Sequence, residues 1–374
     1  MIRVLQFADV INRYDFMDAL VQRTDRGRFV IGVCVRTSES YFEAPVYPRD
    51  TPQWTLNGIS RWEIPRAAFQ LARLLRRWGA DILHAHHYDQ AVIGLLATWL
   101  YPGTKLVVGR HYSDAIYRSS RGWKRKALLA VEQAVNRAAA RIVVPSSYIA
   151  EIVSGWQKVP PGKVDRVPYG FVAEKYAAPR PSDVRCVREE LGLAGRFAVG
   201  TFGRLHEEKG QRFLVRAMAE VRARDPDVIL LVVGEGSERA ALERQIKATG
   251  LGDRVRLLGW RRDTMVLMAA VDAVVQPTLQ EAFSQVMAEA LWMGKPLVIT
   301  DVGGVTDVIR DGENGLLVPK ADPNALAGAV ARLVADAPLR ARLGAAGRAY
   351  VEEQLTIEKI IPMYEQVYLR AMGA

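Results

Sequence analysis

The chain has 374 residues, of which 49% are apolar and 25% are charged. This is ordinary globular composition and excludes a disordered or fibrous protein. No run approaches the roughly 18 consecutive apolar residues of a membrane-spanning helix, and the first residues resemble a strand, not a signal peptide, so we expect a cytoplasmic location. Two distant cysteines, Cys34 and Cys186, provide neither a disulfide framework nor a cysteine metal site.

The net charge of +10 is unevenly distributed along the chain. Residues 1–180 contain 26 Lys and Arg against 15 Asp and Glu, whereas residues 181–374 contain 25 against 26. The first half therefore holds the whole excess. This predicts an acidic partner for that half alone: nucleic acid, anionic lipid headgroups or a phosphorylated substrate.

Short apolar segments alternate with longer helical patterns from end to end. They lie at 4–7, 30–35, 82–86, 105–109 and 141–145, and then at 197–203, 228–234, 255–259, 273–277 and 296–300. Such alternation is typical of parallel sheets covered by helices on both faces, so it predicts an α/β fold. Open sheets of this kind bind ligands at the carboxyl ends of their strands.

A change in composition at about 171–196, where Pro and Gly turns interrupt the strand rhythm, predicts an interdomain linker. We therefore expect two doubly wound, Rossmann-like domains facing each other across a cleft, at 1–175 and 176–355. The remaining segment, 356–374, has a helical pattern from roughly Ile357 to Met372 and can cross back to the first domain as a C-terminal helix.

Two glutamates, Glu281 and Glu289, flank a helix start expected near residues 283–285. Eight residues of helix rise about 12 Å, whereas glycosidases need their two carboxylates roughly 5 to 9.5 Å apart. The pair therefore suits recognition of an extended ligand, and the N–H groups of Phe283, Ser284 and Gln285 suit an anion. Alternatively, Glu281 is only a favourable N-terminal charge and Glu289 a solvated residue.

A second polar turn follows the segment at 197–203. It holds Arg204 and Lys209, five residues apart, before a helical pattern. An arginine fork and a mobile lysine can converge on one anion, such as a diphosphate. The turn lacks the Gly-Lys-Ser/Thr of a Walker loop, which argues against an ATPase, and its alternative is a solvated turn.

Several motifs together resemble a known family. They are GRLxxxKG at 203–210, E-x7-E with EALWMGKPLVITDVGG at 281–304, DGENGLLVP at 311–319, and the segments 81–86, 107–111, 141–147, 167–170 and 322–326. In this order they resemble the retaining glycosyltransferases of the GT-B fold, glycosyltransferase family 4. The resemblance is dense over 197–355 and sparser upstream.

The resemblance implies that the second domain binds a nucleoside-diphosphate sugar and the first domain the acceptor. Arg204 and Lys209 would hold the diphosphate and stabilise the leaving group. Glu281 would bind hydroxyls of the transferred sugar, and Glu289 those of the ribose. His111 would reach the transferred sugar from the first domain.

The remaining donor contacts follow from the same resemblance. The amides of Phe283, Ser284 and Gln285 would fix sugar and phosphate, and Gly259 with Trp260 would border the nucleobase. The acceptor would be a glycan or a lipid-pyrophosphate-linked sugar, as in the synthesis of cell-surface polysaccharide or glycolipid. The resemblance implies a hexosyl transfer with retention of the anomeric configuration, and neither a metal ion nor another cofactor.

The chain departs from the family at several positions. Ala282 and Ser284 stand where glycine is common, and the glycine-rich loop after the first strand is replaced by residues 7–13. Tyr169 stands where asparagine is frequent, and Thr306-Asp307 where Pro-Glu is frequent. These changes leave the donor and the acceptor contacts open.

Two other motifs have simpler interpretations. His84, His86 and His87 form an H-x-H-H cluster that could bind a metal, but without a third ligand at a diagnostic spacing a packing or cleft role is favoured. Gly234-Glu-Gly236 is only a fragment of a dinucleotide fingerprint, which argues against nicotinamide binding.

Two basic stretches rich in aromatic residues, 61–78 and 117–126, could explain the charge of the first half. Such stretches suit the interface of an anionic membrane, which would make the protein peripheral on the cytoplasmic face. Alternatively, a helix at 65–78 buries Phe69, Leu71 and Leu74 in the core and leaves its arginines in water.

Three other functions are weighed against the transferase. A nucleotide-sugar epimerase could use the same fold, whereas a phosphorylase should carry a motif for pyridoxal phosphate, which is not found. A non-catalytic protein that binds nucleic acid or another polyanion is suggested by the charge alone. It does not explain why the donor motifs lie in the neutral half, so nucleic acid is not expected as a partner.

Overall fold

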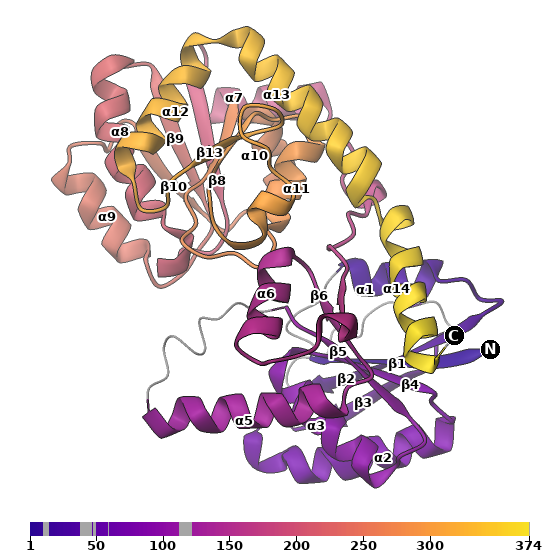
Figure 1. Ribbon diagram of the computed structural model, residues 1–374. Coiled ribbons are helices and arrows are strands. Elements are labelled where there is room, and N and C mark those ends of the chain that lie inside the picture. The colour runs from indigo at the N-terminus through magenta and orange to yellow at the C-terminus, as the bar shows by residue number, and fades with distance from the viewer. Residues whose placement is uncertain (10–14, 38–46, 48–49, 59, 112–121, 374) are drawn as a thin grey trace. The chain divides into compact units, whose positions relative to one another are not determined.

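The computed structural model describes residues 1–9, 15–37, 47, 50–58, 60–111 and 122–373 (Figure 1). The replaced loop at 7–13 and the basic stretch at 117–126 lie partly outside these residues. The chain folds into two compact units. The first unit is Met1–Val172 together with Ile357–Ala374, and the second is Ala173–Thr356.

In its described part, the first unit is a seven-stranded parallel sheet of order β3-β2-β1-β4-β5-β6-β7. The strands are β1 (Ile2–Asp9), β2 (Phe29–Thr37), β3 (Gln53–Asn57), β4 (Ile82–His86), β5 (Lys105–Gly109), β6 (Arg141–Val144) and β7 (Val164–Arg166). The helices are α1 (Asp15–Arg23), α2 (Ile64–Trp78), α3 (His87–Leu100), α5 (Gly122–Ala138), α6 (Ser147–Gly155) and α14 (Ile357–Met372).

Helices cover both faces of this sheet. Helices α2, α3 and α5 lie along one face, and α1 and α14 lie along the other (Figure 1). The C-terminal helix α14 thus belongs to the first unit, where its buried face packs against α1, β5 and β6. The N–H of Ile357, where α14 begins, donates to the Phe171 carbonyl at the end of the same unit.

The described second unit is a six-stranded parallel sheet of order β10-β9-β8-β11-β12-β13. Its strands are β8 (Phe197–Phe202), β9 (Val228–Val233), β10 (Val255–Gly259), β11 (Ala273–Gln276), β12 (Leu297–Thr300) and β13 (Leu316–Val318). Its helices are α7 (Pro181–Glu190), α8 (Gln211–Arg224), α9 (Arg239–Ala248), α10 (Thr264–Ala270), α11 (Gln285–Trp292), α12 (Pro323–Ala335) and α13 (Ala337–Tyr350).

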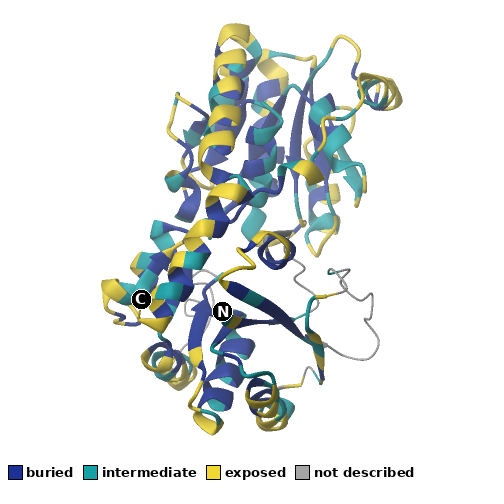
Figure 2. Cartoon of the chain, turned by 90° about the vertical axis from the view of Figure 1, so that its right-hand side faces the viewer, coloured by how far each residue is buried: buried dark blue, intermediate teal, exposed yellow. Residues whose placement is uncertain are grey.

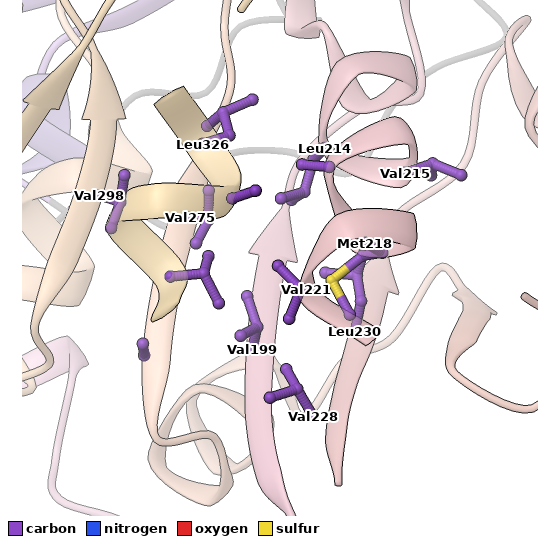
Figure 3. Packing of buried hydrophobic residues seen from close by; sticks show 14 of the residues in the cluster. Val199, Leu214, Val215, Met218, Val221, Val228, Leu230, Val275, Val298 and Leu326 are labelled. Atoms are coloured by element: carbon purple, nitrogen blue, oxygen red, sulfur yellow. The ribbon is translucent and has the colours of Figure 1, made fainter. Parts of the chain in front are cut away.

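The core of the second unit lies between this sheet and the helices α8 and α12. Leu214 and Met218 of α8 and Leu326 of α12 face Val199, Leu230 and Val275 of the sheet (Figure 3). All of these side chains are buried. Each such side chain contributes roughly 1.5 to 3 kcal/mol of burial free energy, so this layer fixes the strand ends that hold the loops described below.

Burial explains why the strands were visible as apolar runs. Every residue of β4, β9, β11 and β12 is buried, as parallel strands covered on both faces must be (Figure 2). The predicted α/β fold with two doubly wound domains is confirmed. Strands β3, β7 and β13 were not predicted, because β3 is only partly buried and the other two have three residues each.

Most of the expected linker at 171–196 belongs to the second unit. It contains α7, which packs against α10 within the second unit, and Arg188 of α7 donates to the Ala270 carbonyl. A proline at the first helical position suits α7, because that residue has no N–H to satisfy. The boundary between the units lies between Val172 and Ala173, inside the range expected for the linker and three residues before the expected boundary at 175/176.

Candidate active site

The loop after β8 is built by glycines that let backbones approach each other. Gly210 has φ +65°, and a Cβ there would lie 2.1 Å from the carbonyl oxygen of Pro277. Pro277 follows β11, the strand beside β8 in the sheet. The chain leaves β8 toward β9 on one side and returns at β11 on the other, so these two loops meet at the topological switch point of the sheet, where α/β proteins bind ligands.

Lys209 and Glu281 meet at this switch point. The Lys209 ammonium donates to Glu281 Oε2 at 2.7 Å, with 23% and 13% of the two side chains exposed. Thr278 Oγ1 lies 3.4 Å from the same carboxylate oxygen, and the Gly304 N–H donates to the Glu281 carbonyl. The structure therefore brings two of the predicted site residues, from segments 72 positions apart, into one hydrogen-bonded pair.

Arg204 lies on the same loop but in a different setting. Its side chain is 76% exposed and its guanidinium is 3.5 Å from Glu208. Arg204 and Lys209 therefore have different carboxylate partners, and the expected convergence of both cations on one anion is not seen in the protein alone. Arg204 has the exposure and freedom to turn toward a bound anion, whereas Lys209 is held.

Helix α11 begins at Gln285 with Ser284 as its N-cap. The Ser284 hydroxyl accepts from the Met287 N–H at 3.2 Å, which satisfies one of the N–H groups at the helix start. Glu281 lies four residues before the helix, so the 12 Å helical rise assumed for the two glutamates does not apply. The phenyl ring of Phe283 is buried and fixes the turn, which leaves only its main chain for ligand contact.

Glu289 lies in the middle of α11, and its carboxylate has a hydrogen-bond partner that the sequence did not suggest. The Tyr176 hydroxyl donates to Glu289 Oε1 at 3.3 Å, and the indole N–H of Trp292 donates to the Tyr176 carbonyl at 3.1 Å. Tyr176 follows the short turn η4 (Ala173–Lys175) in the expected linker. Glu289 is thus an oriented carboxylate, which argues against a merely solvated residue.

The loops after β9 and β10 complete this edge of the sheet. A Cβ on Gly234 would lie 1.9 Å from the Gly203 carbonyl oxygen, and the Leu205 N–H donates to the Glu235 carbonyl at 2.8 Å. The glycines at 234 and 236 therefore serve close packing against the 203–210 loop. Gly259 ends β10 with φ +73°, and Trp260 beyond it is 66% exposed.

His111 lies in the first unit, two residues after β5. Its neighbour Arg110 is buried and forms an ion pair with the buried Glu132 of α5 at 3.1 Å, which anchors the strand end. His111 Nε2 is 2.9 Å from His86 Nδ1, and His111 Nδ1 is 2.8 Å from the Tyr169 hydroxyl. Burial and the nearby His86 and His87 hold the pKa of His111 well below its usual range, so the ring is neutral near pH 7.

The histidine cluster is a packed group in the first unit. His84 and His86 are buried with ring centroids 4.1 Å apart. Burial, and then the nearby His111, lower the pKa of His84 to about 3. Among the residues that the structure describes, no three His, Cys, Asp or Glu side chains are grouped to hold a metal ion.

The aromatic residues of the first unit are exposed to differing degrees. Trp62 is 94% exposed, Trp123 is 74% exposed and Phe69 is 55% exposed. The expectation that Phe69 is buried with Leu71 and Leu74 is wrong, because Phe69 lies on the outer face of α2 with Arg73 over its ring. Leu71 is buried and Leu74 only partly so. Within the described chain, no helix is long and apolar enough to cross a membrane.

Two protein-family models match the chain. Residues 14–175 match the family model Glycosyltransferase Family 4, and residues 196–336 match Glycosyl transferases group 1. HepE from Anabaena, solved in complex with UDP, superposes with a TM-score of 0.82 at 24% identity, over 98% of this chain and 99% of that chain. The fold is that of a GT-B glycosyltransferase.

Two curated relatives place the chain within the family. A D-inositol 3-phosphate glycosyltransferase from Stackebrandtia nassauensis is 34% identical, over 79% of this chain and 71% of the relative. A 2-deoxystreptamine N-acetyl-D-glucosaminyltransferase from Streptomyces fradiae is 30% identical, over 85% of this chain and 78% of the relative. The chain belongs to glycosyltransferase family 4, group 1, and is a glycosyltransferase.

Sequence reasoning missed several residues of these sites. Tyr176 carries no motif, and its contact with Glu289, 113 positions away, was not visible in the sequence. Thr278 lies three residues before Glu281, just after β11, and could have been proposed as a hydroxyl at a strand end. Tyr169 was visible as a departure from the family, but its contact with His111, 58 positions away, was not.

Proposed function

We propose that the chain is a retaining hexosyltransferase that uses a nucleoside-diphosphate sugar and transfers to a glycan or a lipid-linked acceptor, in the synthesis of cell-surface polysaccharide or glycolipid. The observation that carries this proposal is the pair of Lys209 and Glu281 at the switch point of the second sheet. It sets a cation suited to a diphosphate beside a carboxylate suited to sugar hydroxyls.

In the proposed reaction, the acceptor hydroxyl oxygen forms a bond to the anomeric carbon while the bond from that carbon to the diphosphate oxygen breaks. Attack and departure take place on the same face of the sugar, so the configuration is retained. The hydroxyl proton passes to an oxygen of the leaving diphosphate. Arg204 and Lys209 stabilise the negative charge that develops there, and the step needs neither an enzyme nucleophile nor a metal ion.

The other residues of the second unit position the donor. The N–H groups of Phe283 and Ser284, just before α11, and of Gln285, its first residue, lie near the positive end of the helix dipole and suit phosphate and sugar oxygens. Glu289, oriented by Tyr176, accepts from the ribose hydroxyls.

Two assignments complete the proposed donor contacts. Gly259 and Trp260 border the nucleobase, and the exposed indole offers a stacking surface for it. To His111 of the first unit we assign a contact with the transferred sugar.

Donor binding is tested by thermal shift. The wild type is measured with UDP-, GDP- and ADP-sugars beside Arg204→Ala, Glu281→Ala and the control Arg216→Ala, an exposed cation on the outer face of α8. A true donor stabilises the wild type and the control, because a ligand that binds only the folded protein raises its stability, and it fails to stabilise the two site variants. No shift with any donor would contradict the proposal.

Turnover separates transfer from related chemistry. A donor that is epimerised without transfer would identify an epimerase. Transfer that is lost with EDTA and restored only by Mg²⁺ or Mn²⁺ would contradict the proposed metal-free stabilisation by Arg204 and Lys209.

We further propose that the first unit contacts an anionic membrane that carries the acceptor. Support comes from the positive charge of residues 1–180 and from the exposed Trp62 and Trp123. Each Lys or Arg near such a surface contributes about 1 kcal/mol. Binding to anionic liposomes that weakens in Trp62→Ala but not in Trp260→Ala is expected, and equal binding to neutral liposomes would contradict it.

A further inference from the structure

A continuous hydrogen-bond chain runs through the interior of the first unit behind His111. The Tyr169 hydroxyl lies 2.8 Å from His111 Nδ1, and His111 Nε2 lies 2.9 Å from His86 Nδ1. On its far side, His86 Nε2 lies 2.9 Å from Gln6 Oε1. His86 and Gln6 are fully buried and Tyr169 is 6% exposed, whereas His111 between His86 and Tyr169 is partly buried.

The series of hydrogen bonds continues from Gln6 to the C-terminal helix α14. Gln6 Nε2 donates to the Tyr368 hydroxyl of α14 at 2.8 Å, and this hydroxyl lies 3.0 Å from His84 Nδ1. Gln6 and Tyr368 are 362 positions apart in the sequence. Tyr368 of α14 therefore holds an amide that lies two hydrogen bonds from His111.

The orientation of the Gln6 amide, whose Nε2 donates to Tyr368, sets the direction of the bonds from His86 to Tyr169. A neutral imidazole has one nitrogen that donates and one that accepts. Because Gln6 Oε1 can only accept, His86 carries its proton on Nε2, and His86 Nδ1 accepts from His111 Nε2. His111 Nδ1 is then an acceptor, and the Tyr169 hydroxyl donates to it.

These hydrogen bonds hold the His111 ring in place and do not conduct protons. The inner end of the series is His84 Nε2, a buried atom with no hydrogen-bond partner among the described residues. A proton that entered the chain would have no exit there. Burial also lowers the pKa of His84, His86 and His111, which keeps each ring neutral.

The backbone makes room for the central pair. A Cβ on Gly109 would lie 2.6 Å from His111 Nε2 and 3.0 Å from His86 Nδ1. The rings of His111 and Tyr169 stack with centroids 5.5 Å apart and an interplanar angle of 29°. The His111 ring is thus bonded at both nitrogens and stacked on one face.

We propose that Tyr169 is a positioning residue of the transfer reaction: its hydroxyl locks the His111 ring as a neutral tautomer with its proton on Nε2, in the orientation that the chain to α14 dictates. The inference rests on the proposed function, in which His111 contacts the transferred sugar. It adds that His111 acts as an oriented neutral group and is not the base that deprotonates the acceptor. A group bonded at both nitrogens has to break a bond before it can take a proton.

The first measurement reads the tautomer directly and needs no activity. Imidazole ¹⁵N chemical shifts distinguish a protonated from an unprotonated ring nitrogen, and the His111 signals are assigned by their loss in His111→Gln. We expect His111 in the wild type to show the proton on Nε2 near pH 7. A proton on Nδ1, or on both nitrogens, would overturn the proposal whether or not the protein transfers sugar.

The second measurement compares Tyr169→Phe with Tyr364→Phe. The first variant removes the hydroxyl but keeps the stacked ring. The second variant removes the hydroxyl of Tyr364, a buried tyrosine of α14. Its ring packs beside His84, and it is not a member of the hydrogen-bond series described above.

Tyr169→Phe should lower kcat about tenfold, the value of one lost hydrogen bond, with the KM of the donor within about twofold. Tyr364→Phe should keep the wild-type kcat. An unchanged kcat in Tyr169→Phe, or an equal loss in both variants, would contradict the positioning role of the Tyr169 hydroxyl.

The outcomes separate this inference from the proposed function. A wild type that transfers no sugar from any donor contradicts the proposed function, and the role of Tyr169 in transfer falls with it. A wild type that is active, with His111 in the other tautomer or with Tyr169→Phe fully active, contradicts the inference alone.

Discussion

The two units hold their polar site residues in opposite ways. In the second unit the residues are charged and lie on loops at strand ends, as in the pair of Lys209 and Glu281, with Arg204 largely exposed. In the first unit the residues bonded to and beyond His111 are neutral, buried and linked by hydrogen bonds that pass through Tyr368 of α14. Under the proposed function, a held lysine and an exposed arginine serve the charged leaving group, and an oriented neutral ring serves the transferred sugar.

The largest effect is expected from Lys209→Ala, which removes the held cation of the charged site. Transfer, measured as kcat/KM, should fall by about 10² to 10³, the usual cost of losing one group that stabilises developing charge. Arg216→Ala removes an exposed cation of the same unit and should leave the rate unchanged. Equal rates in both variants would show that the diphosphate is held elsewhere.

The next effect comes from the glycines that permit close backbone approach in each unit. Gly234→Ala should lower the free energy of unfolding of the second unit by about 3 kcal/mol, because φ is +140° and the added Cβ meets the Gly203 carbonyl oxygen. Donor-induced thermal stabilisation should be lost with it.

Gly109→Ala should act on the first unit instead, because its Cβ meets the ring of His111. It should reduce kcat without abolishing donor binding. Gly155→Ala, where nothing lies within 4 Å of the added Cβ, is the control for both substitutions. Loss of donor binding in Gly109→Ala would show that the first unit also controls donor binding.

Acid should weaken the first unit before the second. His84, His86, His87 and His111 all have a pKa lowered by burial in the folded protein. Below about pH 6.5 the unfolded chain binds protons that the folded chain does not, so stability falls as pH falls. Even one such histidine costs about 1.4 kcal/mol per pH unit until its folded pKa is reached.

Hydrogen exchange in urea at pH 7.5 and 5.5 separates the units, because β4 and β9 report on different sheets. Protection of β4 should decrease more than that of β9. The control His206→Gln removes an exposed histidine of the second unit and should leave this difference unchanged. A larger decrease in β9 would contradict the assignment of neutral histidines to the first unit.

The smallest effect is expected from Ser284→Ala at the start of α11. Loss of the N-cap should lower the free energy of unfolding by about 1 kcal/mol. Ser284→Thr keeps a hydroxyl that can accept from the Met287 N–H and should restore most of the stability. If the alanine variant lost no stability, the cap would not be what orders this end of the charged site.

The same contrast decides how much could be predicted from the sequence. The fold was predicted, because buried parallel strands such as β9 are unbroken apolar runs. Arg204, Lys209 and Glu281 were predicted because each lies in a local motif at a strand end. The ion pair of Lys209 with Glu281 was not predicted, because it depends on how two loops meet. Both Arg204 and Lys209 were expected to converge on one anion.

The histidine chain could not be predicted at all. Its contacts join Gln6 with Tyr368, and His111 with Tyr169, across long sequence separations that no local pattern encodes. Similarly, the orientation of Glu289 by Tyr176 depends on a turn within a segment expected to be a linker.

The anomeric configuration of the product distinguishes the proposed retaining transfer from an inverting one. The donor identified by thermal shift is incubated with the acceptor, and the coupling of the anomeric proton in the product is followed by NMR from the earliest turnover. We predict the configuration of the donor, as same-face attack with departure of the diphosphate requires. An inverted product would contradict the proposed mechanism and require a base positioned for attack from the opposite face.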